Sequence, residues 1–114
     1  MFTIYHNPRC KKSRAGLQYL QSKTDDIEVV QYLKTPITEA VLKDLLMKLN
    51  KKPHDMIRTQ EAVYKQQFKG KNFNDDEWVK IMVENPKLIK RPIVVSGNKA
   101  VWGDPPEEID IFFK

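Results

Sequence analysis

The chain has 114 residues, a formal net charge of +5, a 40% share of hydrophobic residues, and only one cysteine. This length suits one ordinary domain with its own core, and a single cysteine excludes a disulfide within the chain. Cys10, His6 and His54 are too few ligands for a structural zinc site, so we expect no bound metal. Lysines are spread along the chain among acidic residues, which disfavours nucleic-acid binding.

No apolar stretch approaches the roughly 20 residues that cross a bilayer. Residues 1–5 are apolar, but His6 and Pro8 interrupt them before they reach the length of a signal peptide. We therefore expect a cytoplasmic protein with no membrane partner.

The N-terminal third predicts a strand, a tight loop, a helix and a second strand. Residues 2–6 are β-branched and aromatic, and the turn-forming Asn7-Pro8 ends them. A helical pattern begins at residue 11 and ends before Thr24. Residues 27–33 form a nearly continuous run of β-forming residues. A strand–helix–strand unit of this length favours parallel pairing.

Residues 36–86 predict a helical insertion. After Thr38, a typical N-cap residue, apolar side chains recur at helical spacing. Pro53 suits the first turn of a short helix. Asn74 and Glu77 give a capping-box pattern for a helix over residues 75–84, which Pro86 ends.

The C-terminal segment predicts a hairpin and a last helix. Residues 93–95 and 99–102 are the two strands, on either side of a short polar turn. Asp104 is expected to cap the helix, with Pro105 at its first position. Its expected buried face consists of Ile109, Ile111, Phe112 and Phe113.

These elements indicate a single α/β domain over residues 1–114. Its mixed sheet has about four strands, and residues 36–86 form an inserted helical subdomain.

Cys10 is the main candidate for chemistry. It lies where a strand ends and a helix begins, among unpaired backbone N–H groups that favour a thiolate. The Ser13 hydroxyl, one helical turn on, could donate to the sulfur, and four flanking cations disfavour a merely buried thiol. Because no second cysteine is present, an oxidised Cys10 needs a thiol from another molecule. The four cations are Arg9, Lys11, Lys12 and Arg14.

Several segments resemble, in the same order, the arsenate reductase family that uses glutaredoxin. They are IYHNPRCKKSR at residues 4–14, MIRT at 56–59, YK at 64–65, DDE at 75–77 and NPKLIKRPIVV at 85–95. The resemblance covers essentially the whole chain. It implies a thioredoxin-like fold in which the bond before Pro92 is cis and lies beside the nucleophile.

The resemblance also implies a reaction. The Cys10 thiolate attacks arsenate, glutathione displaces an arsenic-bound oxygen, and glutaredoxin reduces the adduct so that arsenite leaves. No bound cofactor is implied. Glutathione or a similar small thiol is the expected co-substrate, and glutaredoxin or another thiol reductant is the expected partner.

The site residues follow by position. Cys10, His6 and Ser13 are the catalytic candidates. Arg58 and Arg91 match two anion-binding arginines, and guanidinium groups suit tetrahedral oxyanions because they offer paired donors. Arg14 is a further substrate-binding candidate. From the residues alone, the arginines also fit a solvated surface, and His6 fits a packed, hydrogen-bonded residue.

One position departs from the pattern. Asp104, or at best Gly103, stands where the family has a third arginine, and an acid there would weaken oxyanion binding. Two alternatives therefore stay open. One is a monothiol glutaredoxin-like enzyme that acts on glutathionylated or otherwise oxidised thiols. The other is a regulatory protein of the type that binds RNA polymerase, although that type usually has Cys-x-x-Cys and Ser13 departs from it.

Overall fold

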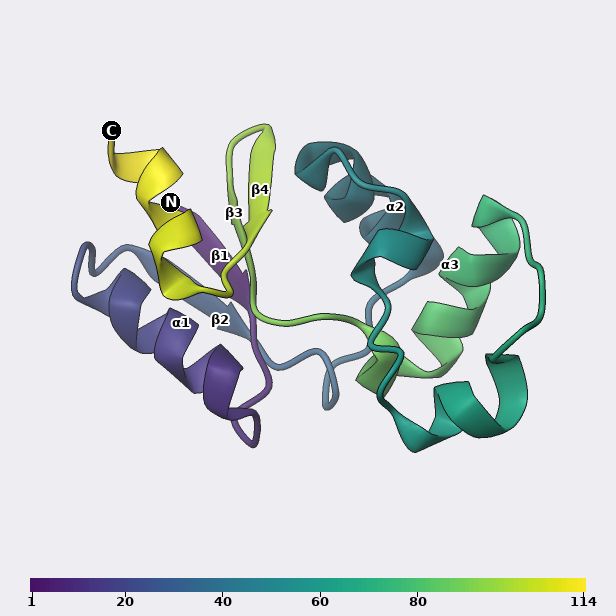
Figure 1. The fold of residues 1–114 in the computed structure, drawn as a ribbon. Coiled ribbons are helices and arrows are strands. Elements are labelled where there is room, and N and C mark those ends of the chain that lie inside the picture. The colour runs from purple at the N-terminus through teal and green to yellow at the C-terminus, as the bar shows by residue number, and fades with distance from the viewer. The chain divides into compact units, whose positions relative to one another are not determined.

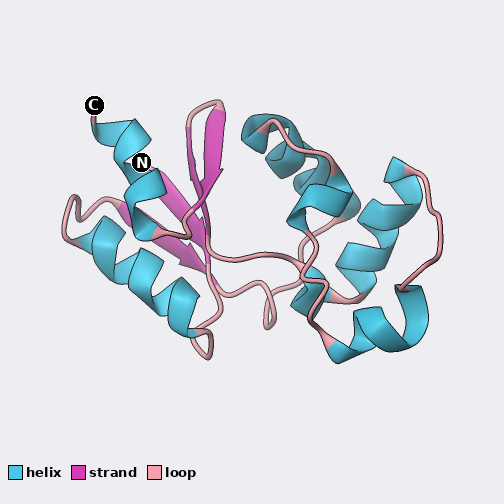
Figure 2. Cartoon of the chain, viewed as in Figure 1, coloured by secondary structure: helices cyan, strands magenta, loops and turns pink.

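The computed structural model describes residues 1–114 and divides into two compact units. The sheet unit consists of Met1–Thr35 and Arg91–Lys114, and the helical unit is Pro36–Lys90. All four strands belong to the sheet unit, and the helical unit contains only helices and loops (Figures 1 and 2). No helix has the length and apolar character that crossing a membrane requires.

The sheet has the strand order β2-β1-β3-β4. The parallel pair is β1 (Phe2–Tyr5) with β2 (Ile27–Val30), and helix α1 connects the two strands. Strand β3 (Ile93–Ser96) runs antiparallel to both β1 and β4 (Lys99–Trp102). This mixed four-stranded sheet confirms the fold class predicted from the sequence.

Two helices pack on the sheet around one apolar cluster. Leu20 of α1 (Lys11–Gln21) and Ile109 of the C-terminal 3-10 helix η4 (Pro106–Phe113) contact a core that includes Ile4 and Val94. Ile4 and Val94 are register partners on adjacent strands, so their side chains lie on the same face. All four side chains are fully buried. This packing fixes the start of α1 just beyond the carboxyl end of β1.

The two main helices of the helical unit begin at the predicted N-caps. In α2 (Glu39–Leu49), the Thr38 hydroxyl accepts from the Val41 N–H at 3.1 Å. In α3 (Asp75–Glu84), Asn74 and Glu77 exchange side-chain and backbone hydrogen bonds at 2.8 and 3.0 Å. Shorter pieces complete the unit: the 3-10 helices Pro53–Met56 and Pro86–Leu88, and a π-helix, Tyr64–Phe68, that the sequence did not predict.

The predicted insertion, residues 36–86, ends four residues before the helical unit, which runs to Lys90. The assignment of the whole chain to one domain stays a prediction.

The prediction for the last helix was wrong at its start. Pro105, not Asp104, occupies the capping position, and no side chain caps the helix. The Asp104 carboxylate instead pairs with Lys12. The buried face was also only half right, since Ile111 and Phe113 are 45% and 40% exposed. In a 3-10 helix residues three apart share a face, so Ile109 and Phe112 pack inward and the other two do not.

Gly16 in α1 offers a test of the packing beside Pro92. A Cβ added at this position would lie 2.5 Å from Pro92 Cγ and 3.2 Å from the Gly103 carbonyl oxygen. Gly16→Ala should therefore lower the free energy of unfolding by about 1–3 kcal/mol through overpacking, despite the higher helix propensity of alanine. Denaturant unfolding measures this difference. The exposed Gln18→Ala in the same helix should change stability by less than about 0.5 kcal/mol, and an equal effect of both substitutions would contradict the packing.

Candidate active site

Cys10 occupies the N-cap position of α1, with extended backbone angles of φ −94° and ψ 122°. An N-cap side chain normally accepts from the free N–H groups of the first helical turn, and oxygen-bearing residues are preferred there. Here the backbone N–H groups of Ser13 and Lys12 lie toward the sulfur. Cys10 is partly exposed, so a molecule from solution can reach it.

The pKa of the Cys10 thiol reflects opposing influences. The largest single influence is burial, which raises the pKa. The backbone N–H of Ser13, the hydrogen bond and positive charge of the Arg91 guanidinium, and the backbone N–H of Lys12 all lower it. Together these outweigh burial, and the pKa lies below that of an ordinary thiol. Because the thiolate is the reactive form, this favours a nucleophile.

Arg91 lies two residues before β3, and its guanidinium hydrogen-bonds to Cys10. It is buried, and the Arg91–Pro92 peptide bond is cis. The end of β4 holds this segment in place: Trp102 Nε1 donates to the Arg91 carbonyl at 3.2 Å, and the Gly103 N–H donates to the Pro92 carbonyl at 2.9 Å. The positive charge that acts on the sulfur is thus that of Arg91. It is not that of the cations that flank Cys10 in the sequence.

His6 and Ser13 are both buried and hold the loop before Cys10. The Ser13 hydroxyl lies 2.7 Å from His6 Nδ1 and accepts from the Asn7 N–H at 3.0 Å. Asn7 in turn accepts from the Cys10 N–H through its carbonyl and from the Arg9 N–H through its side chain, both at 3.0 Å. The hydroxyl of Ser13 therefore anchors the loop, and its expected donation to the sulfur stays a prediction. The part of Ser13 that faces Cys10 is its backbone N–H, as the geometry of a helix start dictates.

His6 is held in its neutral form. Burial is the main cause that lowers its pKa, and the positive charge of Arg14 lowers it further. Arg14 itself donates from Nη1 to the Pro8 carbonyl at 3.0 Å, so it braces the same loop. The structure thus shows loop-holding contacts for His6, Ser13 and Arg14, and the catalytic and substrate-binding roles expected for them stay predictions.

Lys12 and Asp104 form an ion pair that sequence analysis missed. Lys12 Nζ lies 3.3 Å from Asp104 Oδ2. The Asp104–Pro105 bond is cis, and Asp104 follows Gly103, whose N–H holds the Pro92 carbonyl. The capping pattern of Asp104 masked this contact, because an Asp before prolines and glutamates is typical of a helix start.

Arg58 belongs to the helical unit, at the end of the 3-10 helix Pro53–Met56. Its backbone N–H donates to the Leu88 carbonyl at 2.7 Å, and its Nη1 lies 3.9 Å from the Glu61 carboxylate. That Nη1 atom is buried without a hydrogen-bond partner. Its expected role in anion binding stays a prediction.

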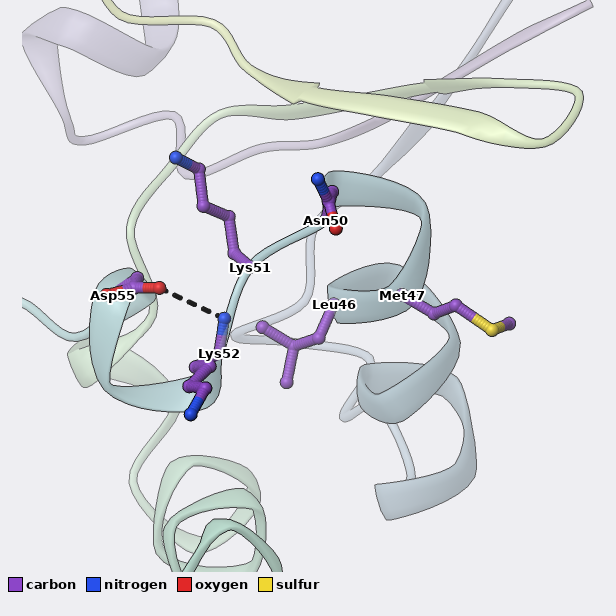
Figure 3. Close-up of a pocket in the computed structure, with 6 residues that line it drawn as sticks. All are labelled: Leu46, Met47, Asn50, Lys51, Lys52 and Asp55. Atoms are coloured by element: carbon purple, nitrogen blue, oxygen red, sulfur yellow. Dashed lines mark hydrogen bonds between the residues drawn. The ribbon is translucent and has the colours of Figure 1, made fainter.

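The helical unit has a surface pocket of about 420 Å³ at the C-terminal end of α2 (Figure 3). The Asp55 carboxylate at its edge accepts from the Lys52 N–H at 3.0 Å. None of the residues that line the pocket is among those predicted for the site. Its lining consists of Leu46, Met47, Asn50, Lys51, Lys52 and Asp55. Nowhere in the chain do three or more His, Cys, Asp or Glu side chains gather as metal ligands.

Fold and site together define a thioredoxin-like protein with a single cysteine whose pKa is lowered by its surroundings. The sequence model of the ArsC family matches residues 5–112, and the chain belongs to this family. This confirms the resemblance inferred from residues 4–14 and 85–95.

Similar proteins support the same assignment. The uncharacterized protein YfgD of Escherichia coli is 43% identical over 108 residues, covering 93% of this chain and 91% of that protein. The arsenate reductase of Neisseria meningitidis serogroup A is 38% identical over 109 residues, covering 94% and 93%. The structure of the arsenate reductase from Vibrio cholerae matches with a TM-score of 0.89 at 39% identity, covering 95% and 93%.

The neutral state of His6 predicts a pH dependence of stability. The folded pKa is below the ordinary value of 6.5, so at pH values below 6.5 the unfolded chain binds a proton more readily than the folded one. The free energy of unfolding should therefore fall as the pH falls below 6.5 toward the folded pKa. Because glutamine does not titrate, His6→Gln should lose this part of the pH dependence of the free energy of unfolding. Urea unfolding across this pH range measures it. The exposed His54→Gln should keep it; a His6→Gln profile identical to wild type would contradict the neutral, buried His6.

Proposed function

We propose that this chain is a thiol-dependent arsenate reductase that uses Cys10 as its nucleophile. The observation that carries the proposal is the lowered pKa of a partly exposed cysteine beside a buried guanidinium. A thiolate next to a cation can attack an electrophilic centre while the cation holds the oxygens around it. Family membership and relatives named arsenate reductase support arsenate as that centre.

The proposed reaction has four steps. A bond forms between the Cys10 sulfur and arsenic(V), and an arsenic-bound oxygen leaves as water. Glutathione then forms a second sulfur–arsenic bond and displaces another oxygen as water. A glutaredoxin thiolate attacks the glutathione sulfur, so a disulfide forms and the electron pair of the broken bond stays on arsenic, which becomes arsenic(III). Water finally displaces Cys10 and releases arsenite.

Each residue of the sheet unit has a distinct part in this scheme. Arg91 stabilises the thiolate and then the negative oxygens as attack proceeds. The first turn of α1 contributes N–H groups at the same place. His6, Ser13 and Asn7 are positioning residues, because their hydrogen bonds fix the loop that presents the sulfur. A cysteine without an internal partner needs the small thiol that the scheme supplies.

A coupled assay tests the proposal. Purified protein with arsenate, glutathione, glutaredoxin and glutathione reductase should oxidise NADPH, and Cys10→Ser should reduce the rate to background. Arg91→Gln should lower kcat/KM about a hundredfold, because a charged donor to the reacting oxygens is lost. Arg9→Gln, which removes an exposed cation next to Cys10 in sequence, should stay within about twofold of wild type. Equal rates for wild type and Cys10→Ser would overturn the proposal.

A second candidate function is favoured by Asp104, whose carboxylate lies beside the start of α1. An acid there suits a glutathionylated thiol better than a doubly charged oxyanion. In this reaction the Cys10 thiolate attacks the glutathione sulfur of the mixed disulfide, so the disulfide bond breaks, the substrate thiolate leaves and Cys10 becomes glutathionylated. The thiolate of a second glutathione then attacks that glutathione sulfur, so oxidised glutathione leaves and the Cys10 thiolate is regenerated. Turnover of a mixed-disulfide substrate with none of arsenate would select this function, and the reverse result would remove it.

A further inference from the structure

The Lys12–Asp104 ion pair stands directly beside the proposed active site. Lys12 is the second residue of α1, and its backbone N–H is one of the groups that lower the pKa of Cys10. Asp104 is tied to the other side of the site, because the neighbouring Gly103 N–H holds the Pro92 carbonyl. The ion pair therefore joins the two segments that carry Cys10 and Arg91.

The pair is unequal in its exposure. The Asp104 side chain is 21% exposed and the Lys12 side chain is 67% exposed. A mostly buried carboxylate needs a nearby cation, whereas an exposed lysine is free to swing toward another anion. Asp104 thus determines where the Lys12 ammonium lies.

We infer that Asp104 is a specificity-determining residue, which holds Lys12 away from the substrate and makes the site select uncharged or singly charged electrophiles over doubly charged oxyanions. The inference rests on the proposed function of Cys10 as the nucleophile. Lys12 and Asp104 neutralise each other, so the pair adds no net charge beside the reacting centre. A dianion that approaches Cys10 must therefore compete with Asp104 for Lys12.

Alkylation of Cys10 by two reagents of similar size but different charge tests this selection. Iodoacetate is an anion and iodoacetamide is neutral, and the ratio of their rates reports the charge that an incoming molecule meets. In Asp104→Asn, at low ionic strength, this ratio should rise about fivefold, and the rise should shrink in high salt. Sulfate, a stable dianion, should also protect Cys10 from iodoacetamide at several-fold lower concentration in this variant.

Lys12→Gln is an independent test, because the Lys12 side chain is exposed and its substitution should not disturb folding. This substitution leaves Asp104 uncompensated, so the ratio should fall several-fold, and the double variant Lys12→Gln, Asp104→Asn should return close to wild type. If Lys12 instead contacted the substrate directly, the double variant would behave like Lys12→Gln. Asp25→Asn, an exposed acid beyond the far end of α1, is the matched control and should leave the ratio unchanged.

An Asp104→Asn ratio within twofold of wild type, or a double variant that matches Lys12→Gln, would overturn the inference. These alkylation measurements need only a reactive Cys10 and no arsenate turnover. They therefore test the inference about Asp104 separately from the proposed arsenate reduction. If wild type turns over arsenate but Asp104→Asn does not change the alkylation ratio, the proposed function stands and the inference about Asp104 fails. If Asp104→Asn changes the ratio but wild type does not turn over arsenate, the inference stands and the proposed function fails.

Discussion

The chemistry of the site depends on a sulfur held at the N-terminus of a helix, next to a buried guanidinium. Burial alone would keep Cys10 protonated, and only the helix N–H groups and Arg91 reverse that tendency. The loop from His6 to Cys10 must therefore keep its shape. It does so through the Ser13 hydroxyl, which joins His6 and Asn7, and through the Asn7 carbonyl, which accepts from Cys10.

The sheet register explains why residues far apart in the sequence meet at this point. Tyr5 at the end of β1 pairs with Ile93 at the start of β3, and Ile93 pairs with Trp102 at the end of β4. Three segments therefore leave the sheet at the same end of the strands. The segment after Tyr5 carries Cys10, the segment before Ile93 carries Arg91, and the segment after Trp102 carries Asp104. The antiparallel order of strands β1, β3 and β4 thereby places these three residues at the same end of the sheet.

Local patterns predicted much of the fold and only part of the site. The caps at Thr38 and Asn74 and the hairpin strands were predictable because they depend on neighbouring residues. The influence of Arg91 on the sulfur and the Lys12–Asp104 pair depend on tertiary contacts, so local sequence did not reveal them. The contacts of the Ser13 hydroxyl with His6 and Asn7 were not predicted for a related reason, because a serine one turn from a cysteine gives no local sign of them. The 3-10 geometry of the last helix likewise followed from no local signal.

The helix N–H groups and Arg91 together lower the pKa of the Cys10 thiol, so that more of it is thiolate at a given pH. The ultraviolet absorbance of the thiolate, titrated against pH with Cys10→Ser as the blank, measures this directly. The wild-type midpoint should lie below the value of about 8.5 for a free cysteine, and the midpoint of Arg91→Gln should be higher. A wild-type midpoint at or above about 8.5, or an unchanged midpoint in Arg91→Gln, would show that these groups do not lower the pKa of Cys10.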